Sequence, residues 1–135
     1  MAVPCVNFLT RTGSVRIRFD NGVSVEAKGR YFTLDIESPL AVSVSDWHLL
    51  FILDKEGDNL AAYTMAGEFA FSLADFGIDE SLIAGSVMTA AEVAISLSRY
   101  PDAPTLDDHI YYLATTKDYR MLWFDLNTGS LIYQR

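Results

Sequence analysis

The first half of the chain alternates apolar and polar residues with a period of two, which predicts strands that each bury one face. Residues 15–19 alternate apolar side chains with arginines, and 23–26 continue the pattern after Asp20-Asn21-Gly22. An Asn-Gly pair between two alternating runs is a strong hairpin signal, because both turn residues must accept positive φ. Further strands are expected over 31–36, 41–45, 60–65 and 68–73.

The segment from Asp46 to Asp54 differs, because apolar residues occupy both of its faces. One face carries Trp47, Leu49, Phe51 and Leu53, and the other carries Leu50 and Ile52. This pattern is typical of a strand that is covered on both sides. We therefore expect it at the centre of a sheet or beneath a helix.

Helical signals appear only after residue 75. Thr89 and Glu92 have the spacing of a capping box, and apolar residues then recur at helical spacing until Pro101. They predict the main helix near residues 89–99. Just before it, Asp79 is a candidate cap for a short helix that ends at Gly85.

Three strands are expected to close the chain, over 110–115, 120–126 and 130–134. The last two are joined through Asn127-Thr128-Gly129, a three-residue hairpin loop with glycine at the left-handed position. Over about fourteen residues this hairpin resembles the outer hairpins of β-propeller blades, but a closed propeller needs at least four such blades. We interpret the likeness as common hairpin chemistry. Residues 47–71 and 109–133 also share an order of strands and turns, which is a faint internal echo.

Together these elements predict an α+β fold in one domain that spans residues 1–135. A mainly antiparallel, strongly twisted sheet of about eight to nine strands, built from hairpins and meanders and either continuous or split in two, is expected to pack against the main helix. The C-terminal meander is expected to pair with the strand at Asp46 to Asp54.

Composition indicates a soluble protein with a real core. Half of the 135 residues are apolar, and no apolar run approaches the roughly 18 residues that span a bilayer. The first residues lack the features of a signal peptide. Cys5 is the single cysteine, which favours a reducing compartment, and its thiol is expected to be buried and inert. We expect a cytoplasmic location.

The net charge of −8 is concentrated in the middle of the chain. Residues 46–108 carry twelve acidic and two basic residues, whereas each flanking segment has a net charge of +1. Such acidity disfavours nucleic acid and anionic membrane surfaces and favours a basic protein as partner. The alternative is that the charge only keeps the protein dispersed.

No catalytic signature occurs in the sequence. His48 and His109 both lie near acidic residues, so either could be a general base oriented by a carboxylate. Their spacing does not match a metal motif, and we expect structural or surface histidines. Phosphate-binding, dinucleotide, zinc, calcium and serine-nucleophile patterns are missing, so no catalytic residue, metal or cofactor is expected.

The residues expected to bind a partner combine acidic steering with aromatic anchors. The acidic ones are Asp46, Asp54, Glu56, Asp58, Glu68, Asp75, Asp79 and Glu80. The aromatic ones are Tyr119 and Trp123, and the alternative is that the C-terminal aromatic residues belong to the core.

These features favour a non-catalytic, acidic protein-binding module, specifically a small inhibitor or immunity-type protein that masks a basic site on its partner. Two alternatives stay open. The chain could be a small-molecule-binding or enzymatic α+β domain, which a pocket holding His48 or His109 would favour. It could also be a structural or homo-oligomeric subunit such as a homodimer, which a concentration-dependent mass would favour.

Overall fold

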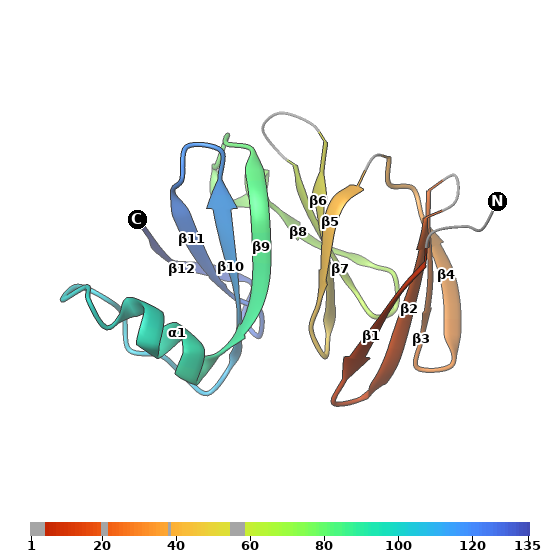
Figure 1. The fold of residues 1–135 in the computed structure, drawn as a ribbon, viewed down its shortest axis with the longest axis horizontal. Coiled ribbons are helices and arrows are strands. Elements are labelled where there is room, and N and C mark those ends of the chain that lie inside the picture. The colour runs from red at the N-terminus through yellow and green to blue at the C-terminus, as the bar shows by residue number, and fades with distance from the viewer. Residues whose placement is uncertain (1–4, 20–21, 38, 55–58) are drawn as a thin grey trace.

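Three four-stranded antiparallel sheets make up most of the computed structural model, which describes residues 5–19, 22–37, 39–54 and 59–135 (Figure 1). The N-terminal sheet contains β1 (Cys5–Thr10), β2 (Gly13–Phe19), β3 (Val23–Ala27) and β4 (Arg30–Leu34). The central sheet contains β5 (Pro39–Val44), β6 (His48–Leu53), β7 (Leu60–Thr64) and β8 (Phe69–Ser72). The C-terminal sheet contains β9 (Leu82–Thr89), β10 (Ile110–Thr116), β11 (Met121–Asp125) and β12 (Ser130–Gln134). The helices described are the 3₁₀ helix η1 (Leu73–Phe76) and the α-helix α1 (Ala90–Leu97).

Each sheet is a meander in which strands that follow one another in the chain also pair. The prediction of an antiparallel, α+β-like fold is confirmed, but the prediction of one sheet with eight to nine strands is wrong, because twelve strands are described in three sheets. The predicted pairing of the C-terminal meander with the strand at Asp46 to Asp54 is also wrong, because that meander pairs with β9, and β6 pairs with β5 and β7. The alternation of apolar and polar residues indicates which face of a strand is buried, but it does not indicate which strand lies next to it. In this chain, short turns pair each strand with its neighbour in the sequence.

The central sheet is covered on both faces. Leu49 and Phe51 of β6 pack against the N-terminal sheet in one apolar cluster, and Leu50 and Ile52 pack against the C-terminal sheet in another. All four side chains are at most 1% exposed. The prediction that residues 46–54 hold a strand buried on both sides is therefore confirmed.

The N-terminal sheet buries one face only. Val15, Ile17, Val23 and Val25 point toward the central sheet, and the polar residues between them are largely exposed. Phe19 pairs with Val23, as the hairpin signal predicts. The predicted turn residues Asp20 and Asn21 lie outside the described residues.

The helix α1 covers the outer face of the C-terminal sheet. Val93 and Leu97 are buried there against Tyr111 and Trp123. The predicted capping box is confirmed, because the Glu92 N–H donates to Thr89 Oγ1 at 3.2 Å and the Thr89 N–H donates to Glu92 Oε1 at 2.9 Å.

The segment before α1 is a strand and not the expected helix. Residues Leu82–Thr89 form β9, which pairs along β10. Strand β1 was also not expected from the sequence. Among the described residues, no helix is long and apolar enough to cross a membrane.

A buried side chain links the central sheet to the C-terminal sheet through hydrogen bonds. Asn59, which is 1% exposed, precedes β7 and reaches Leu82 at the start of β9. The Leu82 N–H donates to Asn59 Oδ1 at 3.0 Å, and Asn59 Nδ2 donates to the Leu82 carbonyl at 3.1 Å. The Asn59 amide thus forms the two hydrogen bonds that the backbone of a neighbouring strand would form, and it links the central sheet to the C-terminal sheet.

Candidate functional site

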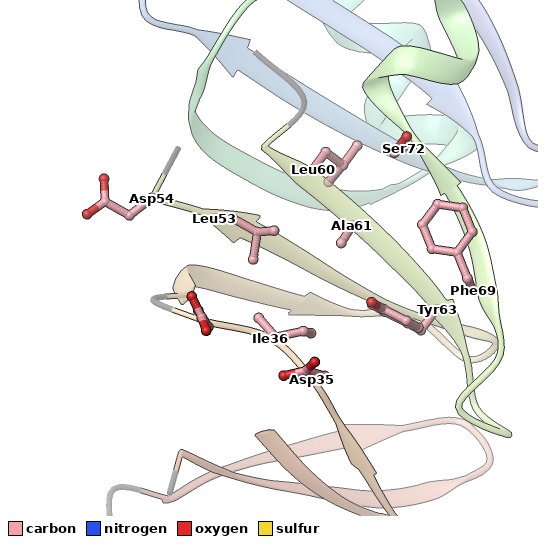
Figure 2. A pocket seen from close by; sticks show the side chains of 10 residues that line it. Asp35, Ile36, Leu53, Asp54, Leu60, Ala61, Tyr63, Phe69 and Ser72 are labelled. Atoms are coloured by element: carbon pink, nitrogen blue, oxygen red, sulfur yellow. The ribbon is translucent and has the colours of Figure 1, made fainter. Parts of the chain in front are cut away.

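A groove of about 440 Å³ opens at the margin of the central sheet, beside the segment that links β4 to β5 (Figure 2). Its lining comes from that linker, from the end of β6, and from β7 and β8: Asp35, Ile36, Glu37, Leu53, Asp54, Leu60, Ala61, Tyr63, Phe69 and Ser72. Below, this hollow is called the acidic groove.

The linker positions two carboxylates by burying the residue between them. Ile36 is 3% exposed in the cluster between the N-terminal and central sheets, and its N–H donates to the Leu34 carbonyl at 3.0 Å. Asp35 and Glu37 on either side are therefore exposed. Asp54 adds a third exposed carboxylate from the end of β6.

Two aromatic rings line the groove on β7 and β8 (Figure 2). Tyr63 and Phe69 are directly paired across the strands, and their rings meet edge to face with centroids 5.8 Å apart. Tyr63 in turn packs edge to face on the fully buried Phe51 at 6.2 Å. The core therefore holds the inner ring in place, whereas Phe69 is 57% exposed.

This lining suits a cationic side chain. Among the described residues that line the groove, three are acidic and none is basic. Carboxylates accept charge-assisted hydrogen bonds from guanidinium or ammonium groups, and aromatic faces attract such cations. In the described part of the chain, no set of three or more His, Cys, Asp or Glu side chains is arranged to hold a metal ion.

The structure places the predicted acidic residues on several turns. Asp54 lines the acidic groove, whereas Asp46 forms a hydrogen bond within the fold. The Arg11 N–H donates to Asp46 Oδ1 at 2.9 Å, and the Asp46 side chain is 13% exposed. Glu68 is exposed in the turn before Phe69. Glu56 and Asp58 lie outside the described residues.

The remaining predicted acidic residues lie between β8 and β9. Asp75 accepts the Ser72 N–H at 2.9 Å at the start of η1, and Asp79 is exposed. Glu80 is half-buried and paired with Arg120 of the C-terminal sheet. None of these three carboxylates is among the residues that line the acidic groove.

The two predicted aromatic anchors have opposite environments. Tyr119 is 80% exposed on the turn between β10 and β11, where its φ is +65°. Trp123 is 1% exposed beneath α1 and is not available to a partner in this structure. Because the C-terminal sheet is covered on both faces, Trp123 and Phe124 are both buried on opposite sides of β11.

The two histidines lie in different contacts, and neither lines the acidic groove. His48, on β6, packs against Phe71 with ring centroids 6.2 Å apart. His109 Nδ1 is hydrogen-bonded to Asp125 Oδ2 at 2.7 Å. Asp125 also accepts the Asn127 N–H at 2.9 Å through Oδ1. The His109–Asp125 pair therefore connects the start of β10 to the hairpin formed by β11 and β12.

The stability of the fold is expected to respond to the two histidines in opposite pH ranges. The hydrogen bond with Asp125 raises the pKa of His109, so its stabilisation is complete below about pH 6.5 and is lost as the pH rises through the raised value. Burial lowers the pKa of His48, so stability is lost as the pH falls below about 6.5. Urea unfolding across pH 5–9 should show that His109→Gln removes the alkaline loss and His48→Gln removes the acidic loss. Unchanged profiles in both variants would contradict this assignment.

Cys5 corrects one sequence prediction. It is exposed and unpaired, not buried. The alternation of β1 explains this, because Phe8 packs into the core between the sheets and residues of the opposite parity, including Cys5, face outward.

Sequence reasoning missed most of the acidic groove. Asp54 was predicted, but Asp35, Glu37, Tyr63 and Phe69 were not. The available signal was an apolar residue between two acidic ones, Asp35-Ile36-Glu37, directly after a strand pattern. Comparison with protein-family models, with curated proteins and with solved structures finds no match to this chain.

Proposed function

We propose that this protein is a non-catalytic protein-binding module whose acidic groove receives a basic segment of a partner protein. The observation that carries the proposal is the lining of the groove, where three carboxylates lie with two aromatic rings and, among the described residues, without a basic side chain.

The groove offers both the charged and the apolar contacts that such binding needs. A lysine or arginine side chain would place its charged end between Asp35, Glu37 and Asp54 and its methylene stem against Phe69 and Tyr63. The partly exposed Phe69 ring loses water in such a contact, which slows dissociation. The remaining acidic surface speeds the encounter with a basic protein.

In its most specific form, the proposal is a small inhibitor or immunity-type protein that masks a basic site on its partner. A reducing, cytoplasmic location is part of this proposal, since Cys5 is a single, exposed thiol. Occlusion of a basic site needs only shape, charge and anchors, so no catalytic group of this chain takes part.

Neutralising the groove is expected to weaken the binding of a basic peptide by about threefold to a hundredfold, because three exposed ion pairs contribute roughly 0.2–1 kcal/mol each. The variant is Asp35→Asn, Glu37→Gln and Asp54→Asn together. The probe is a fluorescein-labelled octapeptide of alternating lysine and alanine, and its anisotropy is measured at low and at high salt.

The matched control changes the net charge by the same amount outside the groove. Asp79, Asp108 and Asp118 are exposed and lie on other turns, so their combined replacement by Asn tests general electrostatics alone. Equal weakening in the two triple variants would exclude the groove as the binding site. A second variant, Phe69→Ser, should increase the dissociation rate and leave the salt dependence unchanged.

A further inference from the structure

The two ends of the stack of sheets carry uncovered surfaces (Figure 1). At one end lies the outer face of the N-terminal sheet. Because Val15 and Ile17 are buried, Arg16 and Arg18 of the same strand point outward. Leu9 and Tyr31 lie on this outer face by strand register and are 89% and 66% exposed.

This end is basic, although the protein as a whole is acidic. Residues 5–34 carry five basic and two acidic residues, a net charge of +3. Glu26, opposite Arg16 in the register, is the acidic residue that the structure describes in this sheet. Below, this surface is called the basic face.

At the other end lie α1 and the segment that follows it. The helix uses Val93 and Leu97 to cover the C-terminal sheet, which leaves Ala91, Ala94 and Ile95 exposed. The Ile95 side chain is 75% exposed. An apolar helix face is thus presented to the exterior.

This second end has the opposite charge. Residues 90–108 carry four acidic residues and one basic residue, a net charge of −3. Asp102 is paired with Arg135 and Tyr133, but the exposed side chains of Asp107 and Asp108 form no hydrogen bond or ion pair with the described residues. Below, this surface is called the helical face.

We infer that two copies of this chain associate head to tail, with the basic face of one copy against the helical face of the other. The segments that carry the two faces have net charges of opposite sign, and each face offers exposed apolar side chains, Leu9 and Tyr31 on one and Ile95 on the other. The contact joins a basic surface to an acidic one, so it is favourable even though each copy has a net charge of −8. The interface is heterologous, so it closes into a ring or extends as a filament.

The acidic groove lies on neither face, so this inference does not depend on the proposed function. Peptide binding at Asp35, Glu37 and Asp54 can fail while association persists, and the reverse also holds.

Sedimentation equilibrium from micromolar to near-millimolar protein tests the inference. At about 0.1 M salt, where the screening length is about 10 Å, mainly the charges at the contact count. We expect a mass that rises with concentration above the monomer value of 15.0 kDa and falls back at about 1 M salt, where the screening length is about 3 Å. Continuous growth means an open chain of copies, and a limit at three or more copies means a closed ring; both support the contact. A mass that stops at twice the monomer value would contradict it, because faces at opposite ends of the stack cannot both be satisfied within one pair.

Charge-reversal variants distinguish this contact from nonspecific association. The variant Arg16→Glu with Arg18→Glu and the variant Asp107→Lys with Asp108→Lys should each stay at the monomer mass, because each brings like charges together. An equimolar mixture of the two should associate again, since each variant restores the partner that the other needs. The control Asp79→Lys with Asp118→Lys should associate like the original chain, and circular dichroism verifies that all variants are folded.

Two further results would overturn the inference. One is a monomer mass for the original chain at every concentration, which would leave the basic face to an anionic partner. The other is association that neither charge reversal affects, which would place the contact elsewhere on the surface.

Discussion

Replacing Gly85 by alanine is expected to destabilise the fold by about 3 kcal/mol or more, at the upper end of the overpacking range. A Cβ at this position would lie 1.7 Å from Tyr112 Oη and 2.4 Å from its Cζ, where real contacts are never this short. Tyr112 is 0% exposed between the central and C-terminal sheets and has no free volume to enter. The urea midpoint should fall with little change in the m-value.

A double variant identifies the cause. In Gly85→Ala with Tyr112→Leu the clashing ring atoms are gone, so the pair should be less destabilised than the sum of the single changes, by more than about 1 kcal/mol. Ser86→Ala, at an exposed neighbour on β9, should stay within about 0.5 kcal/mol of the original chain. Additive effects at 85 and 112 would mean that Gly85 is required for another reason.

Asn59→Ala is expected to cost about 3 kcal/mol. The change removes the hydrogen bonds to both backbone groups of Leu82 and a third to the Leu53 carbonyl at 3.3 Å. A buried backbone group left without a partner costs about 1–3 kcal/mol. The loss should separate the start of β9 from the central sheet, which amide hydrogen exchange at Leu82 would report.

Asn127→Ala is the matched control for this loss. Asn127 Oδ1 also accepts a backbone N–H, from Ile110 at 3.0 Å, but at an exposed site where water can replace it. Its removal should cost no more than about 1 kcal/mol. A similar loss of unfolding free energy in the two variants would contradict the proposal that the buried hydrogen bonds of Asn59 hold β9 to the central sheet.

The local elements of this fold were largely readable from the sequence. Alternation predicted strands around Val15 and Val25, the double-sided apolar run predicted the buried strand β6, and the Thr89–Glu92 spacing predicted the helix start. Each of these signals depends on residues within a few positions of one another. The division into three sheets depends on packing between segments and has no such signal.

Strand β9 illustrates a specific failure. Its centre, Ala84-Gly85-Ser86, is small and has no period of two, so the segment does not resemble a strand. The glycine is required by the Tyr112 ring, which comes from a position 27 residues later in the chain. A sequence pattern read locally cannot contain that reason.

The acidic groove was only partly predictable for the same reason. Asp54 was predicted because it belongs to the acidic middle of the chain and alternates with Glu56 and Asp58 around a predicted turn. Asp35 and Glu37 belong to a linker, and they reach Tyr63 and Phe69 only because the N-terminal sheet packs on the central one. Trp123 was predicted to be a surface anchor, but the structure buries it, because α1, which lies earlier in the chain, covers that face of the C-terminal sheet.

Pairing between consecutive strands gives the chain a low contact order for a protein made mainly of strands. The N-terminal sheet is closed by residues 5–34 alone, so loop-closure entropy opposes its formation only weakly. We therefore expect this meander to form first during synthesis. Until β6 emerges, the apolar face with Ile17 and Val25 has no cover. While residues 35–53 are being synthesised, the nascent chain is thus expected to present an apolar sheet face on which it can aggregate or bind a chaperone.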